Sequence, residues 1–455
     1  MISIKSIKNN KIIFILCFLL NSTSALADYF AYIPDQANEE NNKLLHVVNT
    51  KYNVLVDSIP IIGSPRDVVL SHRADFVFVS SVSIEGSLSD SKVSVIDTYT
   101  NQLMFWITIN NTKKNVRGLT ITKDDTTLFV THTGGITRIT QPTYSPVQTH
   151  LNLQYSGTSL VLSDDEQYLF VIGTDANNND GISVVDISQE TMTEIATANY
   201  SLGTGADVSS IVFDKLYKEL YVINRSNKSL NEGGQLINFG ILNYDTPDSL
   251  QLEVKKTKFF ASDSYPLDVA LNADSTELYV VLSHLPSDTD KDNNPDLAEG
   301  TGNGSIVVLN PSDITGELIS NINDLSAEGG GNGYQSLGAI HPLSVAFDNS
   351  GKLHVVKQIW NEYPGTYVSS INDTSSVRTG VRNMSEGTSV HLGKISSSQL
   401  TGKFVGAECS FCPKGIDLDS QPVIHPSAIN PFMLLFAFIF FIPYRLKRNE
   451  NNHFR

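Results

Sequence analysis

A run of acidic residues late in the chain has the spacing of a calcium-binding loop. Numbered from Asp288, carboxylates fall at positions one, three, five, nine and twelve: Asp288, Asp290, Asp292, Asp296 and Glu299. Position seven is Asn294, which could supply its backbone carbonyl. Ca2+ takes about six to eight oxygen ligands, and a loop with this spacing can wrap around one ion. Position six is Asn293 instead of glycine, and asparagine tolerates the left-handed backbone better than most residues. We therefore expect a calcium loop of EF-hand spacing, with a solvated acidic loop as the alternative.

Two arginines and two histidines form a second candidate site. Arg66 and Arg117 each begin an alternating strand, whereas His132 and His284 each follow a strand with a central aromatic residue. Since successive strands of a sheet unit alternate in direction, all four residues are expected at the same end of their units, at the mouth of a central pore. Such a ring could bind an anion or a carbohydrate carboxylate. Ordinary surface histidines are the alternative interpretation.

Several common catalytic and cofactor motifs are missing from the sequence. No serine stands in a G-x-S-x-G context, and there is neither a P-loop nor an H-E-x-x-H motif. Cys409 and Cys412 are followed by Pro413, not by histidine, which excludes the usual c-type haem attachment. The sequence thus predicts no nucleotide and no haem cofactor, and the cysteine pair is interpreted as a local disulfide or as part of a processing tail.

The strands that must hold these residues come from an internal repeat. Seven segments place an aromatic residue, or once a histidine, before valine or isoleucine: Ala31-Tyr32-Ile33, Val77-Phe78-Val79, Leu128-Phe129-Val130, Leu169-Phe170-Val171, Leu220-Tyr221-Val222, Leu278-Tyr279-Val280 and Leu353-His354-Val355. A second alternating strand follows each segment and ends on a small hydrogen-bonding residue. Repeat periods of roughly 40–50 residues are typical of solenoids and propellers.

One unit, read in full, predicts a four-stranded antiparallel sheet. Its strands are expected at residues 65–71, 76–80, 93–97 and 103–109. Radial repetition would cover the faces of such sheets. First strands of this kind precede only six of the aromatic strands, so residues 388–393 are expected to supply the seventh and to close the ring. The predicted fold is all-β: a seven-bladed β-propeller of four-stranded blades over residues 28–395, closed by a C-terminal strand.

The repeats resemble the YVTN family of β-propeller repeats. The matching segments include residues 266–274, residues 277–280 and residues 92–98, and the resemblance extends over roughly residues 29–395. Members of this family include bacterial surface proteins and lactonase-like enzymes. The resemblance implies the fold and says little about activity, because one architecture hosts many functions.

The first 27 residues have the pattern of a signal peptide. Lysines precede an apolar segment at residues 12–20, and Ala25-Leu26-Ala27 is a cleavage site of the A-x-A type. The apolar segment is too short to span a bilayer, so cleavage is favoured over a signal anchor. The protein is therefore expected to be exported to the periplasm or the cell surface. Its formal net charge of -16 argues against a nucleic acid as partner, since that binding needs clustered lysine and arginine.

The C-terminal part of the chain differs from the repeats. Residues 396–430 are a polar linker with the cysteine pair, and residues 431–455 comprise a short hydrophobic helix followed by a basic tail. An apolar stretch with a basic flank is typical of a membrane stop with a cytoplasmic end. The tail is similar to the C-terminal sorting signals of Gram-negative surface proteins, although no Pro-Glu-Pro or Gly-Gly motif precedes the helix. A sorting signal and a permanent membrane anchor both fit this pattern.

Together these patterns favour binding over catalysis. We expect a non-enzymatic binding or adhesion propeller, monomeric, displayed at the bacterial envelope and recognising a protein or a carbohydrate. The alternative is a lactonase- or lyase-like enzyme that acts at the mouth of the pore. Connections between second and third strands, and between fourth and first strands, include long loops, whereas first and second strands are joined by tight turns. The functional site is therefore expected on the face with the long loops.

Overall fold

The computed structural model describes the repeat region with gaps. The described residues are 30–35, 44–49, 54–82, 91–109, 115–225, 234–261, 264–284, 305–322, 340–347, 353–359, 365–371 and 378–380. The chain divides into two units, Met1–Phe411 and Cys412–Arg455, and all described residues belong to the first. The predicted signal peptide, calcium loop, closing strand, cysteine linker and C-terminal helix lie outside the described residues. Within the described ranges, no helix has the length and apolar character needed to cross a membrane.

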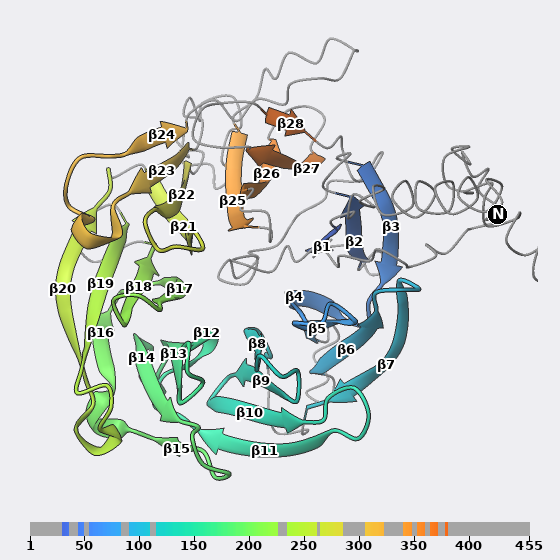
Figure 1. Ribbon diagram of the computed structural model, residues 1–455, viewed down its shortest axis with the longest axis horizontal. Coiled ribbons are helices and arrows are strands. Elements are labelled where there is room, and N and C mark those ends of the chain that lie inside the picture. Colours follow the sequence, from blue (N-terminus) through green and yellow to red (C-terminus); the bar gives the residue numbers. More distant parts are fainter. Residues whose placement is uncertain are drawn as a thin grey trace, which may run out of the picture. The chain divides into compact units, whose positions relative to one another are not determined.

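The described strands form antiparallel sheets that follow one another along the chain (Figure 1). The first sheet consists of β1 (Phe30–Asp35), β2 (Leu44–Asn49) and β3 (Val54–Pro60). The second consists of β4 (Ser64–Leu70), β5 (Phe76–Val82), β6 (Lys92–Asp97) and β7 (Gln102–Thr108). The third consists of β8 (Leu119–Ile121), β9 (Thr127–His132), β10 (Gly135–Thr140) and β11 (Val147–Asn152).

The remaining sheets repeat this order, with one extra strand in the fourth. That sheet contains β12 (Ser156–Leu162), β13 (Tyr168–Thr174), β14 (Asn179–Asp186), β15 (Thr193–Glu194) and β16 (Tyr200–Thr204). The next contains β17 (Val208–Asp214), β18 (Glu219–Asn224), β19 (Gln235–Leu242) and β20 (Gln251–Phe259). The last two are β21 (Ser264–Leu271), β22 (Leu278–His284), β23 (Ser305–Leu309) and β24 (Ser320–Ile322), then β25 (Ile340–Phe347), β26 (Leu353–Ile359), β27 (Gly365–Ile371) and β28 (Arg378–Gly380). Short 3-10 helices stand at η1 (Ala196–Ala198), η2 (Pro247–Ser249) and η3 (Pro311–Asp313).

The prediction of seven four-stranded blades is wrong. The described residues form a six-bladed propeller, because six sheets have the four strands of a complete blade, one of them with a fifth. The sheet β1–β3 has only three strands, and its β1 corresponds to the aromatic second strand of the other units. Counting aromatic strands therefore overestimated the blades, since an aromatic strand marks a sheet without showing that the sheet is complete. Residues 388–393, expected to complete it, lie outside the described residues.

The aromatic strands themselves are confirmed, and they form the core. Their central residues are buried at 5 % exposure or less, at Tyr32, Phe78, Phe129, Phe170, Tyr221 and Tyr279. Along β5, β9 and β18 nearly every residue is buried, because each blade packs on both faces against its neighbours. Core clusters therefore run from blade to blade; one joins β4–β7 with β8–β10, and another joins β13 and β14 with β17–β20.

The inner strand of most blades contains a β-bulge near its start. The pairing with the second strand shifts between Pro65 and Asp67, between Gly157 and Ser159, between Val208 and Ser210, between Pro266 and Asp268, and between Pro342 and Ser344. A bulge leaves one residue outside the ladder and redirects its side chain. In β4 that residue is Arg66, so the fold itself sets the direction of a predicted site residue.

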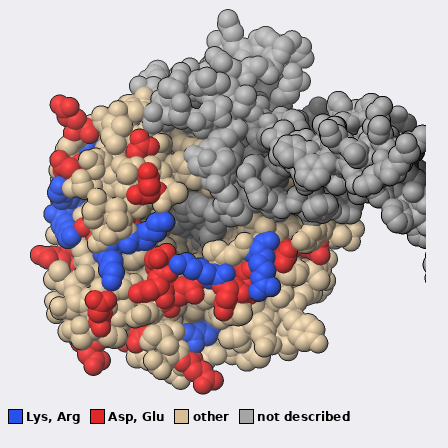
Figure 2. Space-filling model, viewed as in Figure 1, with Lys and Arg blue, Asp and Glu red and all other residues tan. Residues whose placement is uncertain are grey.

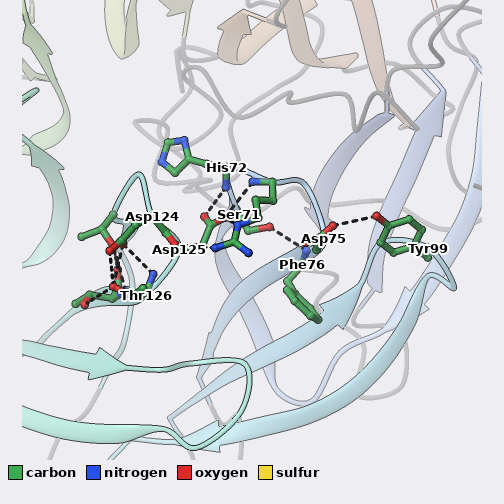
Figure 3. Close-up of polar contacts among 11 residues, drawn as sticks. Ser71, His72, Asp75, Phe76, Tyr99, Asp124, Asp125 and Thr126 are labelled. Carbon is green, nitrogen blue, oxygen red and sulfur yellow. Dashed lines mark hydrogen bonds and ion pairs between the residues drawn. The ribbon is translucent and has the colours of Figure 1, made fainter. Parts of the chain in front are cut away.

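The tight turns between first and second strands connect neighbouring blades at the opposite end (Figure 3). The carboxylate of Asp125, in the turn before β9, accepts hydrogen bonds from the backbone N–H groups of His72 (2.5 Å) and Arg73 (3.0 Å) in the preceding blade. Glu166 repeats this contact one blade later, on the backbone N–H of Lys123. Asp125 and Glu166 both have positive φ, 63° and 57°, which aims their side chains at the neighbouring turn.

Candidate functional site

The two predicted arginines lie at the starts of neighbouring inner strands. Arg66 is the bulged residue of β4, and Arg117 stands two residues before β8. The backbone of Arg117 is held on both sides: its N–H donates to the carbonyl of Thr131 (2.9 Å), and its carbonyl accepts the Ser80 hydroxyl (2.5 Å). The position of Arg117 is thus determined by β9 in its own blade and by β5 in the preceding one.

A third arginine joins this pair from another blade. Arg225 directly follows β18, and its guanidinium Nη2 forms an ion pair with Oδ1 of Asp207, the residue before β17. Their backbones are also bonded, because the N–H of Arg225 donates to the carbonyl of Asp207 (2.9 Å). Both residues lie where the second strand ends and the first begins, which is the end of the blade predicted to carry function.

Arg66 and Arg117 are each within electrostatic reach of another arginine. Burial lowers the pKa of Arg66, and the charge of Arg117 lowers that pKa further. Burial likewise lowers the pKa of Arg117, and repulsion from Arg225 adds to this effect while Asp207 opposes it. Arg117 belongs to the blade β8–β11 and Arg225 to the blade β17–β20, and the blade β12–β16 lies between them in the order of sheets. The two arginines therefore interact across the inner end of the blade β12–β16. We call Arg66, Arg117 and Arg225 the arginine cluster.

Arg117 is the member of the cluster most suited to hold a ligand. Within the described ranges its guanidinium donates no hydrogen bond, and part of the residue is exposed to solvent although its surroundings are dense enough to lower its pKa. It stays charged at physiological pH, because a guanidinium is not deprotonated in proteins. Two neighbouring guanidiniums repel, and a bound anion would remove that repulsion. On the coloured surface in Figure 2, basic and acidic side chains are mixed.

Two carboxylates lie beside the arginine cluster, and both already have partners. Asp207 pairs with Arg225. Asp180, at the start of β14, is 7 % exposed; its Oδ1 accepts the Thr174 hydroxyl (2.8 Å) and its Oδ2 the N–H of Val208 (2.9 Å). Burial is the main cause that raises the pKa of Asp180. Neither carboxylate is placed as an unengaged general base.

Of the two predicted histidines, only His132 has a described side chain. His132 is fully buried inside its blade, where Nε2 contacts the Thr137 hydroxyl (3.1 Å) and Nδ1 contacts the Thr133 carbonyl (3.2 Å). The same Thr137 hydroxyl lies 2.6 Å from Nδ1 of His150. His284 is the last residue of β22, opposite Ser264, and its side chain lies outside the described part of the structure.

The proposed calcium ligands remain a prediction. All of them, from Asp288 to Glu299, lie between the described ranges 264–284 and 305–322. Among the residues that the structure does describe, no group of three or more histidine, cysteine, aspartate or glutamate side chains is arranged to hold a metal ion.

Arg225 and Asp207 were missed by the sequence analysis. Arg225 follows the second strand of its blade, near the place where His132 and His284 end theirs. That equivalence was a usable signal. The ion pair itself was not visible in the sequence, because its partners belong to two different strand ends that only the sheet register brings together.

Comparisons with known proteins extend the fold assignment and no further. No protein-family model and no curated protein matches the chain. Among solved structures, a provisionally assigned 6-phosphogluconolactonase from Bacteroides fragilis is similar, with 13% identity and a TM-score of 0.53 over 79% of this chain and 95% of that one. Another provisionally assigned 6-phosphogluconolactonase, from Bacteroides uniformis, has 14% identity and a TM-score of 0.52, covering 78% and 96%.

A periplasmic gluconolactonase of Pseudomonas aeruginosa is similar to the same extent. It shares 13% identity and a TM-score of 0.51, over 78% of this chain and 99% of that chain. Identities this low support a common β-propeller architecture, and one such architecture hosts many functions.

Proposed function

We propose that this propeller is a non-enzymatic binding protein for a small anionic ligand held at the arginine cluster. The observation that carries the proposal is Arg117, a charged residue that is exposed in part to solvent and whose guanidinium has no hydrogen-bond acceptor among the described residues. Its neighbours Arg66 and Arg225 add positive charge from two other blades.

The chemistry of the cluster favours a carboxylate or a phosphate. A guanidinium presents a planar fork of N–H donors that matches either group with two parallel hydrogen bonds. An anion between two arginines that repel one another binds favourably, because its attraction to both offsets their mutual repulsion. A sugar acid combines such a charged group with hydroxyls that suit a protein surface, in line with the carbohydrate ligand expected from the sequence.

Hydrolysis of a sugar lactone is the second candidate. It is supported by the names of the similar structures and by the two carboxylates beside the cluster. Against it, Asp180 and Asp207 both have hydrogen-bonded or ion-paired oxygens, whereas a general base needs access to the proton that it removes. Binding is therefore the better-supported function.

Calorimetric titration of the mature protein with D-gluconate and with orthophosphate tests the proposal. We expect saturable binding of at least one of these anions, and an affinity at least about tenfold lower in Arg117→Gln, since a charged hydrogen-bonding group is lost. Arg73→Gln is the matched control, because Arg73 is exposed on a turn at the opposite end of the blades. Absence of binding, or equal binding by Arg117→Gln, would contradict the proposal.

A pH-stat assay with D-glucono-1,5-lactone separates the two candidates. A binding protein should leave the rate of spontaneous lactone opening unchanged. An acceleration that Arg117→Gln removes would show that the protein is an enzyme.

The export of the protein and its kinship with YVTN propellers also remain proposals. They are supported by the signal-peptide pattern of residues 1–27 and by the repeated strand pattern. Fractionation of the producing cells, followed by N-terminal sequencing, checks the first: the mature chain should begin at Asp28 and be found outside the cytoplasm.

A further inference from the structure

Asp207 lies among the arginines in a fixed position. Its Oδ1 pairs with Arg225, its carbonyl accepts the N–H of Arg225 (2.9 Å), and its own N–H donates to Oδ1 of Asn224 (2.9 Å). The side chains of Asp207 and Arg225 are 31% and 13% exposed, so the pair is partly shielded from solvent. The carboxylate therefore cannot easily turn away from the cluster when a ligand arrives.

The charge of Asp207 acts on residues beyond its own partner. It raises the pKa of Arg117, opposing the effect of Arg225, and it also raises the pKa of Asp180. Any anion held by Arg117 would lie in the same field. Arg225 adds positive charge beside Arg117, and the negative charge of Asp207 opposes it.

We propose that Asp207 determines which anions the site accepts, by favouring ligands with one or two negative charges over ligands with three. This inference rests on the proposed anion-binding function. Coulomb energy scales with the product of the interacting charges, so the repulsion between Asp207 and a bound anion grows in proportion to the charge of the anion. A residue that merely supports the local fold would affect the binding of every anion equally.

Asp207→Asn tests this with a minimal change. Asparagine keeps an Oδ1 acceptor for Arg225 and removes only the negative charge. The probes are D-gluconate, with one negative charge, and 6-phosphogluconate, with about three near pH 8, titrated at fixed low ionic strength. At a separation of about 6 Å in water, one unit charge changes the affinity for a monoanion by about threefold. We therefore expect about threefold tighter binding of gluconate and about thirtyfold tighter binding of 6-phosphogluconate.

Three comparisons make the result specific. Arg225→Gln should have the opposite effect and weaken 6-phosphogluconate more than gluconate. Asp207→Glu should retain the wild-type preference, because the charge is kept. Asp245→Asn, at an exposed carboxylate paired with Lys218 on a turn, should change neither affinity. Salt should reduce all charge-dependent differences, since it screens them.

An equal change for both probes in Asp207→Asn, or weaker binding of 6-phosphogluconate, would overturn the inference while leaving the proposed function intact. Loss of all anion binding in the wild-type protein would instead remove the proposed function, and this inference with it. Thermal melting of each variant shows whether an altered affinity reflects an unfolded protein.

Discussion

Among single residues, Asp268 combines complete burial with an unusual set of partners. Its Oδ1 accepts the N–H of Val269 (2.8 Å) and the hydroxyl of Ser210 (2.9 Å), and its Oδ2 accepts the N–H of Val345 (3.1 Å) and the hydroxyl of Ser344 (2.5 Å). These partners lie in β17, β21 and β25, so one carboxyl group links the inner strands of three successive blades. Burial raises its pKa to about 7, although the four hydrogen bonds oppose the shift.

This pKa predicts that stability depends on pH near neutrality. A carboxyl group whose pKa is higher in the folded state binds its proton more tightly there, so it contributes stability at low pH that is lost as pH rises through about 7. Unfolding by urea between pH 5 and pH 8 should show this loss, with a slope of at most about 1.4 kcal/mol per pH unit for one proton. Asp268→Asn should remove that part of the slope, whatever its effect on absolute stability.

Ser344→Ala provides the companion measurement. The Ser344 hydroxyl stabilises the charged carboxylate, so its removal should move the midpoint of the pH dependence upward. A pH dependence that is identical in wild type and Asp268→Asn would show that this carboxyl group does not titrate in the range.

At the level of elements, the first-to-second-strand turns act as links between blades. The carboxylate of Asp125, with a side chain 12% exposed, bonds two backbone N–H groups of the preceding turn. Asp125→Asn retains a residue that accepts positive φ but leaves one of these N–H groups facing an amide N–H2. We expect the free energy of unfolding to fall by about 1–2 kcal/mol.

Asp164→Asn is the matched control for that prediction. Asp164 also lies in such a turn and pairs with Lys123, but both side chains are 57% exposed. Exposed pairs contribute little, so the loss should stay within about 0.5 kcal/mol. A loss within about 0.5 kcal/mol in Asp125→Asn as well, measured by urea denaturation, would mean that the turn contact does not couple the blades.

The loop from Asp288 to Glu299 carries the calcium prediction. Binding to the folded state alone stabilises it by roughly 2.7 kcal/mol at a hundredfold excess of free ion over the dissociation constant. Asp288→Ala combined with Glu299→Ala should abolish this gain and leave the melting temperature in chelator nearly unchanged. Identical melting of the wild type in millimolar calcium and in chelator, without heat of binding, would leave only an acidic loop.

The strands were predictable from sequence to a greater degree than the site. An aromatic residue between apolar neighbours recurs in all but one of the units, and burial on both faces of a blade demands such continuous apolar runs, so strands such as β5 and β18 follow directly. Completeness of a sheet depends on which distant segment pairs with it, and no local pattern records that pairing. For this reason the sequence did not reveal that the sheet β1–β3 has only three described strands.

The same distinction explains the site residues. Arg66 lies near the start of an inner strand and Arg117 just before another, and that position alone brings them to one end of neighbouring blades. The direction of a side chain depends on register as well as on strand order. His150 lies opposite Thr137 across β10 and β11, so His132 finds its partners inside the blade. The ion pair of Arg225 needs the register of β17 against β18, which propensity does not encode.

For the whole molecule, the contact that brings the two ends of the repeat region together is the one between the last described blade and the first sheet. Ala346 in β25 is fully buried in the same core cluster as Ala31 and Leu45, from β1 and β2. The sheets at the two ends of the described repeat region therefore pack together in this core cluster. This contact buries the faces that would otherwise remain open at both ends of a row of blades.

Two alanines at equivalent positions allow this closure to be tested. Ala270 follows Asp268, and Ala346 follows Ser344, by two residues, and Asp268 and Ser344 each end the β-bulge of their strand. Ala270 packs in the cluster shared by β21–β23 and β25–β26, which is an ordinary contact between consecutive blades. Leucine at either position overfills a packed interface, which costs about 1–3 kcal/mol. If the closing contact is as tight as a consecutive one, Ala346→Leu and Ala270→Leu should shift the urea midpoint by similar amounts with an unchanged m-value. A shift for Ala270→Leu alone would mean that the ring opens in solution between β25 and β1, since an interface that separates freely has room for the larger side chain.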